Sequence, residues 1–213
     1  MEFSHAQDWA STERFKNDNA NLEGPAPREE RIVFMGNSIT ESWKRFRPSF
    51  FENTSFVNRG IGGQTTPQMV TRFQPDVINL KPSAVVILAG VNDIAGNTGP
   101  STLEMIMDNI ISMAELAKAN NINVILSSAL PAFDFSWRPG LEPAGKIIAL
   151  NKMIKDYAVK SDIVYLDYFS AMVDDRDGLK DEYTYDGVHP NAAGYKVMEP
   201  LALEAIKEAL TKK

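Results

Sequence analysis

The sequence predicts a single α/β domain in which helices cover both faces of a five-stranded parallel sheet. Short apolar runs typical of buried strands alternate along the chain with longer segments that show helical spacing. The length of 213 residues suits one such domain. A hydrophobic content of 44% and a charged content of 23% are ordinary for a globular protein and argue against disorder.

The strands are predicted from mostly apolar runs that end at turn-forming residues. The first run ends at Gly36, and the most apolar run ends at Gly90. The five predicted strands are residues 32–35, 55–58, 84–89, 122–126 and 163–166. Because the best of these runs are apolar throughout, both faces of the sheet should be buried.

Helices are predicted where apolar residues recur every three or four positions. Residues 101–120 show this stripe most clearly, and residues 143–160 and 191–212 behave similarly. Pro143 and Pro190 stand near the starts of the last two segments, where proline is favoured.

The N-terminal part is predicted to be an extension, residues 1–27, that packs on a single domain formed by residues 28–213. Residues 8–22 carry Trp9, Phe15 and Leu22 among polar residues, and we expect a helix that covers part of the core. Residues 24–27 then break the chain. Residues 1–7 show neither a positively charged start nor an apolar core, so we expect no intact signal peptide. We hypothesise that residues 4–6 are the remnant of a removed leader, which predicts a periplasmic or secreted protein; otherwise a cytoplasmic one is expected.

Composition restricts the class of partner. The net charge of −6 provides no basic surface for nucleic acid. No apolar run reaches the roughly 20 residues of a membrane helix. The chain has no cysteine and two histidines, too few nitrogen and sulfur ligands for an attractive zinc site, and we expect neither metal nor cofactor. The oligomeric state stays open.

One histidine stands in a pattern that suggests catalysis. Asp186 precedes His189 by three residues, and Pro190 follows it. Histidine is the side chain whose ordinary pKa lies near neutrality, and an aspartate can hold its ring in one tautomer. The alternative is a surface loop in which the histidine is incidental. The other histidine, His5, lies near the terminus and is expected to have no role.

The matching nucleophile is sought after the first strand. Ser38 lies at a predicted strand-to-helix turn, where its backbone N–H would sit at a helix N-terminus and favour negative charge. The alternative is a capping serine. Thr40 replaces the second glycine of the G-x-S-x-G elbow, so an ordinary α/β-hydrolase is not expected.

Two further segments offer hydrogen-bond donors. Residues 58–66 are rich in glycine, but Thr65 interrupts a dinucleotide fingerprint and no lysine completes a phosphate loop. The segment is then interpreted as a loop whose accessible backbone N–H groups could bind an oxyanion. The alternative is a tight turn that needs glycine for its positive φ. Asn92 follows the third strand, where its amide could donate to an oxyanion or complete a turn.

An aromatic loop follows the fourth strand. Phe133 and Trp137 could form a wall for an acyl group or a sugar, with Arg138 available to a polar or anionic part of the substrate. The alternative is a loop anchored by buried rings. The acidic residues at 174–182 are expected to form a solvated loop. All these segments follow carboxyl ends of predicted strands or precede the last helix, the edge where open α/β sheets bind ligands.

The four segments that carry Ser38, the glycine-rich loop, Asn92 and the Asp186–His189 pair occur in an order that resembles the SGNH hydrolases, also called the GDSL esterase/lipase family. The second block is similar to that of the platelet-activating-factor acetylhydrolase catalytic subunits. Asn37 departs from the family, which usually has aspartate before the serine. In the family this residue supports the loop and takes no part in the chemistry, so the departure affects the fine tuning of the site and not the assignment. The resemblance covers roughly residues 31–200, with blocks at residues 34–40, 58–65, 90–93 and 186–190.

The resemblance implies a flavodoxin-like three-layer α/β/α sandwich and a role for each block residue. Ser38 would be the nucleophile, His189 the general base and then acid, and Asp186 the residue that orients His189. The Ser38 N–H, the Gly63 N–H and the Asn92 side chain would form the oxyanion hole.

The predicted activity is hydrolysis of short-chain esters, expected to be acetyl esters of a carbohydrate, because no long apolar insertion would form a lid or acyl channel. The alternatives are a lysophospholipase or thioesterase for longer acyl chains, or a non-catalytic flavodoxin-like ligand-binding domain. The expected partner is a small-molecule or oligosaccharide ester.

Overall fold

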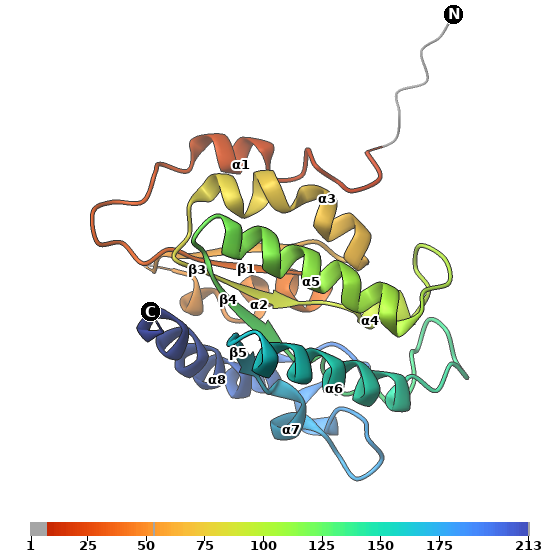
Figure 1. Cartoon of the computed structure of the whole chain (residues 1–213). Coiled ribbons are helices and arrows are strands. Elements are labelled where there is room, and N and C mark those ends of the chain that lie inside the picture. The colour runs from red at the N-terminus through yellow and green to blue at the C-terminus, as the bar shows by residue number, and fades with distance from the viewer. Residues whose placement is uncertain (1–7, 53, 213) are drawn as a thin grey trace, which may run out of the picture.

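The computed structural model describes residues 8–52 and 54–212, and its centre is one parallel sheet (Figure 1). Neighbouring strands pair in parallel in the order β2-β1-β3-β4-β5. The strands are β1 Ile32–Gly36, β2 Phe56–Gly60, β3 Ala84–Leu88, β4 Asn123–Ser127 and β5 Val164–Leu166. The predicted fold class is confirmed, and each strand begins and ends within two residues of its expected range.

Helices cover both faces of the sheet (Figure 1). One face packs against α3 Thr66–Asp76, α5 Leu103–Ala119 and α6 Ala144–Lys160. The other packs against α2 Ser38–Phe46, α7 Tyr168–Met172 and α8 Ala192–Thr211. The short elements are α1 Lys16–Asn21, α4 Val91–Ile94 and the 3-10 turns Pro48–Phe50, Ile78–Leu80 and Asp181–Tyr183.

Alternation along β1 shows why its apolar run is continuous. Val33 and Met35 enter the core beneath α3, α5 and α6, whereas Ile32 and Phe34 enter the core beneath α2 and α8. Successive side chains of a strand point to opposite faces, so a strand covered on both sides must be apolar at every position.

An aromatic cluster fixes α2 against the sheet and α8. The indole of Trp43 stacks on Phe50 at 4.9 Å and on Tyr195 at 5.5 Å between ring centroids. The hydroxyl of Tyr195 donates to the carbonyl of Ile39 at 2.7 Å. Because α2 begins at Ser38, this packing also fixes the position of that residue.

The expected helix over residues 8–22 is wrong in extent, since only the six residues of α1 are helical. Ser11 has a φ of 54°, and the Asp8 carboxylate accepts the Thr12 N–H at 2.9 Å, so this part forms turns. Phe15 is buried, but the Trp9 side chain is 51% exposed. His5 and the leader remnant suggested at residues 4–6 lie outside the described residues.

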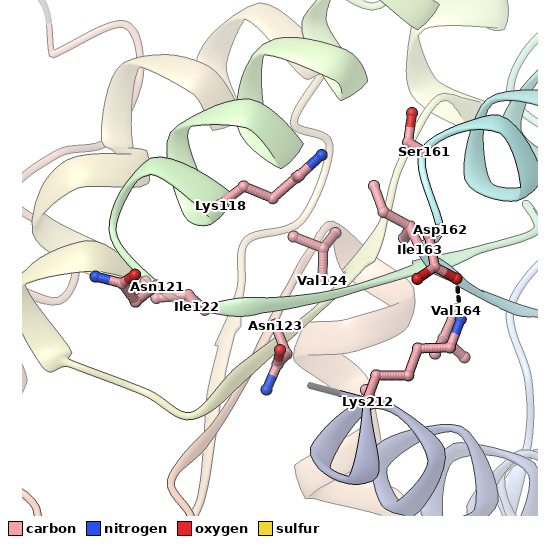
Figure 2. A pocket seen from close by; sticks show the side chains of 11 residues that line it. Lys118, Asn121, Ile122, Asn123, Val124, Ser161, Asp162, Ile163, Val164 and Lys212 are labelled. Carbon is pink, nitrogen blue, oxygen red and sulfur yellow. Dashed lines mark hydrogen bonds and ion pairs between the residues drawn. The ribbon is translucent and has the colours of Figure 1, made fainter.

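A cavity of about 350 Å³ with a mixed polar and apolar lining lies at the amino ends of β4 and β5, opposite the edge expected to carry the site (Figure 2). Lys212 and Asp162 form an ion pair there at 3.0 Å. None of the predicted site residues lines this cavity. Over the described residues, no helix combines the length and apolar composition needed to cross a membrane.

Candidate active site

A chain of hydrogen bonds joins three predicted residues at the carboxyl edge of the sheet. The Ser38 Oγ lies 2.9 Å from the His189 Nε2, although 151 positions separate the two residues. The His189 Nδ1 lies 2.7 Å from the Asp186 Oδ2. An ionised Asp186 accepts a hydrogen bond from the Nδ1–H of His189, which leaves Nε2 unprotonated and able to accept the serine hydroxyl proton.

The loop that carries Asp186 and His189 is closed by hydrogen bonds to the carboxylate. The Asp186 Oδ1 accepts the backbone N–H groups of His189 at 2.7 Å and of Val188 at 3.0 Å. Partial burial by itself would raise the pKa of Asp186, but these bonds and the contact with the His189 ring outweigh it, and the pKa lies below its ordinary value. Asp186 is therefore ionised at neutral pH.

Two aromatic side chains pack against the His189 ring. Tyr185 stacks on it with ring centroids 5.8 Å apart and an interplanar angle of 12°. Trp137 lies 5.9 Å from it at an angle of 39°. Trp137 was expected to face this edge, whereas Tyr185 was missed; its position next to Asp186 was the available signal.

Ser38 is the first residue of α2, so its backbone N–H points out of a helix N-terminus. The Asn37 side chain caps the helix by accepting the Ile39 N–H at 3.3 Å. Within the part of the chain that the structure describes, the Ser38 N–H has no hydrogen-bond acceptor. Asn37 thus performs, with an amide oxygen, a capping role open equally to aspartate.

In the glycine-rich loop after β2, two adjacent N–H groups differ in whether they have an acceptor. The Gly62 N–H donates to the Glu41 carboxylate at 3.0 Å. The Gly63 N–H has no acceptor among residues 8–52 and 54–212, and Gly63 adopts a φ of 75°, which glycine reaches most readily. The Asn92 amide is buried and donates one N–H to the Gln64 carbonyl at 2.9 Å, and its nitrogen carries a second N–H.

A buried arginine connects the segments that carry these donors. Arg72 is fully buried, and its guanidinium donates to the Gly36 carbonyl at 3.0 Å, to Asp76 at 3.0 Å and to the Gln64 side chain. Since the Gln64 carbonyl accepts from Asn92, one side chain ties together the ends of β1 and β2 and the start of α4. We did not predict α3, so this buried ion pair was missed; the spacing of four residues between Arg72 and Asp76 is compatible with a pair but does not indicate its burial.

Asp93 fixes the start of α3 beside Asn92. Its carboxylate accepts the Thr66 N–H at 3.0 Å and the Thr66 hydroxyl at 2.6 Å. Burial raises the pKa of Asp93, and the bonds from Thr66 oppose that shift only partly. This carboxylate was also missed by the sequence analysis.

The aromatic loop is anchored by one buried ring and presents two others. Phe135 is fully buried and stacks on Trp137 at 4.9 Å, while Phe133 is 56% exposed. Arg138 was expected to be available to substrate, but its guanidinium donates to the Ala95 carbonyl at the end of α4. In this structure Arg138 therefore attaches the loop to the helix that begins beside Asn92.

The acidic segment at 174–182 is exposed at most of its carboxylates, as expected for a solvated loop, and hydrogen bonds to Asp174 close it. The Asp174 carboxylate accepts the N–H groups of Gly178 at 2.7 Å and Arg176 at 2.9 Å, and also pairs with the Arg176 guanidinium at 2.9 Å. The segment faces the aromatic loop across a cavity of about 280 Å³ that reaches Asp186. Among the described residues, no group of three or more His, Asp or Glu side chains is arranged to hold a metal ion.

Comparisons with known proteins give a matching family and similar structures. The model of the GDSL-like lipase/acylhydrolase family matches residues 34–197. A candidate acylhydrolase from Bacteroides fragilis NCTC 9343 is 49% identical, with a TM-score of 0.94 over 96% of this chain and 100% of its own. A Streptococcus pneumoniae protein named for platelet-activating factor is 23% identical and shares the fold, with a TM-score of 0.75 over 92% of each chain.

A longer relative carries a more specific name. The acetylxylan esterase of Xylanibacter ruminicola is 26% identical over 222 aligned positions, which cover 86% of this chain and 45% of the relative. The chain spans less than half the length of the curated relatives it matches.

Proposed function

Because the chain belongs to the GDSL-like lipase/acylhydrolase family, we propose that it hydrolyses carboxylic esters through an acyl-enzyme formed on Ser38. The observation that supports this most strongly is the hydrogen-bonded chain from Ser38 through His189 to Asp186. A serine hydroxyl is a weak nucleophile at neutral pH, and a neighbouring imidazole is what activates it.

In the proposed mechanism, the Ser38 Oγ attacks the ester carbonyl while the His189 Nε2 takes the hydroxyl proton. The imidazolium that forms is stabilised by Asp186, which stays ionised. His189 then gives the proton to the departing alcohol. Water attacks the acyl-enzyme by the same route, which releases the acid and restores Ser38.

The tetrahedral oxyanion would be bound by three donors: the N–H groups of Ser38 and Gly63 and the side chain of Asn92. The two backbone groups have no acceptor within the described part of the chain, and Ser38 adds the positive end of α2. The buried support behind Asn92 keeps that donor in place before substrate arrives, which is how oxyanion stabilisation is most effective.

We propose a short acyl group, acetyl in the first place, esterified to a carbohydrate. Trp137 supports this proposal because its ring is 41% exposed and lies beside His189, where it could pack on a sugar or a small acyl group. The similarity to the acetylxylan esterase of X. ruminicola also supports an acetylated carbohydrate as the substrate.

The test is hydrolysis of p-nitrophenyl esters from acetate to decanoate, with acetylated xylo-oligosaccharides as a second substrate. We expect acetate to be the best ester, and Ser38→Ala to abolish turnover while Ser49→Ala, an exposed serine in the Pro48–Phe50 turn, retains it. Equal rates for wild type and Ser38→Ala would contradict the nucleophile assignment. A maximum at decanoate would favour a lysophospholipase or thioesterase instead.

A further inference from the structure

We propose that the cavity between the aromatic loop and residues 174–187 binds a neutral sugar ring, next to the one whose ester is cleaved. This cavity, called here the Phe133 cavity, is lined chiefly by Phe133, Phe135, Arg176, Leu179, Asp181 and Asp186. The inference rests on the proposed function, because it extends the substrate by one ring.

The position of the Phe133 cavity follows from the geometry of His189. Asp186 lines the cavity and contacts the Nδ1 side of the imidazole, whereas Ser38 contacts the Nε2 side. The esterified ring must be on the Nε2 side, because its ester carbon has to reach the Ser38 Oγ. A ring held beyond Asp186 is therefore a different ring of the same substrate.

The lining suits a sugar, which has apolar C–H faces and a polar rim. Phe133 presents a half-exposed aromatic face, with Leu179 and Phe135 adding buried apolar surface. Arg176 lies over the Phe133 ring at 5.7 Å and is held by Asp174, so its donors are oriented without a ligand. Binding sites for small molecules typically combine such apolar walls with a few placed polar groups.

The charge of the Phe133 cavity selects against anionic ligands. Three carboxylates line it, those of Asp134, Asp181 and Asp186, against the single guanidinium of Arg176. Hydrogen bonds from the N–H groups of Gly140 and other residues hold the pKa of Asp134 below its ordinary value, so it is ionised at neutral pH. A phosphate head group or a carboxylated sugar would be repelled, whereas an uncharged ring would not.

The volume limits the ligand to about one ring. Pockets that enclose a complete drug-sized ligand measure about 300–1,000 Å³, and the Phe133 cavity, at about 280 Å³, lies just below that range. The cavity therefore fits one sugar unit of a longer chain rather than a second complete substrate.

The test compares kcat/KM for an acetylated xylotriose with kcat/KM for p-nitrophenyl acetate, which has no second sugar ring to place in the cavity. We expect the ratio of the two to fall about tenfold in Phe133→Ala, the loss of roughly one aromatic contact, and to fall in Arg176→Gln. Phe133→Tyr keeps the ring and should keep the ratio. Trp9→Ala removes an exposed aromatic outside the cavity and should also leave the ratio at the wild-type value.

The outcomes separate this inference from the proposed function. If the wild type cleaves acetylated xylotriose and the ratio of the two kcat/KM values is the same in Phe133→Ala, the sugar-binding cavity is overturned. The proposed carbohydrate esterase activity is left intact by that result. A wild type that cleaves p-nitrophenyl acetate but no acetylated sugar would overturn both. Equal kcat/KM for acetylated xylotriose and a matched trimer carrying a uronic acid would contradict the charge argument.

Discussion

The two halves of the proposed active site are held in different ways. The base side, residues 184–190, is a short loop whose histidine packs against two partly exposed aromatic rings. The oxyanion side, which comprises Gly63, Asn92 and the residues behind them, rests on the fully buried guanidinium of Arg72. One half depends on local hydrogen bonds within a loop and the other on a polar network inside the protein.

Two carboxylates show the consequence of this difference. Asp186, on the base side, is partly open to solvent and accepts several hydrogen bonds, and its pKa is lowered. Asp93, on the oxyanion side, is buried, and its pKa is raised despite the bonds from Thr66. In the proposed mechanism, the base side must keep an ionised group next to a residue that gains and loses protons. The oxyanion side, in the same mechanism, needs donors that do not move during the reaction.

The largest expected effect comes from the base side. Asp186→Asn should lower kcat for p-nitrophenyl acetate by about 10⁴, as when the orienting aspartate of a serine triad becomes an amide and the wrong histidine tautomer results. Thermal unfolding should change little, because the new Oδ1 can still accept the His189 N–H. Asp108→Asn, at an exposed aspartate of α5, is the control for activity. A loss of less than tenfold in Asp186→Asn would contradict the assigned role.

The next effect concerns stability on the oxyanion side. Arg72→Met should destabilise the fold by about 3–5 kcal/mol, because it leaves Asp76 buried without its partner. Arg47→Met, which breaks the partly exposed pair with Glu199, should cost only about 1 kcal/mol. Urea unfolding of both variants measures the difference. Equal losses would mean that the buried network is no more important than a surface pair.

A catalytic loss on the oxyanion side should be smaller than that of Asp186→Asn. Asn92→Ala removes one of three proposed donors and should lower kcat by about 10²–10³, with little change in KM. The exposed Asn79→Ala is the matched amide control. If kcat for Asn92→Ala stays within threefold of wild type, the Asn92 amide is not a donor to the oxyanion.

The smallest effect is a change in how stability depends on pH. Because the pKa of Asp93 is raised on folding, the native state binds more protons there than the unfolded chain, and stability should fall as pH rises above 3.8 through the native value. Asp186 has the opposite sign, so its contribution is lost as pH falls below 3.8. Asp93→Asn should remove the first trend, which urea midpoints at pH 4 and pH 7 would show. A variant that retains the wild-type trend would exclude Asp93 as its source.

The fold and the base side could be predicted because they depend on local sequence features. Apolar strands and helical stripes mark the sheet and its layers, and the carboxyl ends of parallel strands must meet at one edge. That geometry places Ser38 beside His189 once the last helix is in position. The predicted helix over residues 8–22 was wrong in extent, because three apolar residues without a regular spacing do not determine a helix.

The supporting residues could not be predicted, because their roles depend on burial by distant segments. Arg72 and Asp93 are ordinary charged residues in the sequence, and only the packing of α3 against the sheet makes them internal. Arg138 was assigned to substrate from its charge alone, yet the folded loop brings it to the Ala95 carbonyl. The position of Tyr185 next to Asp186 is visible in the sequence, but its stacking on the His189 ring is set by the folded loop.

The central claim, that Ser38 is activated by His189 and Asp186, is tested most directly by a serine-directed p-nitrophenyl phosphonate followed by peptide mass spectrometry. Wild type should release one equivalent of p-nitrophenol and carry a single adduct on the peptide that contains Ser38. Asp186→Asn should react far more slowly at the same site. An adduct on any other residue, or equal labelling rates in wild type and Asp186→Asn, would contradict the account.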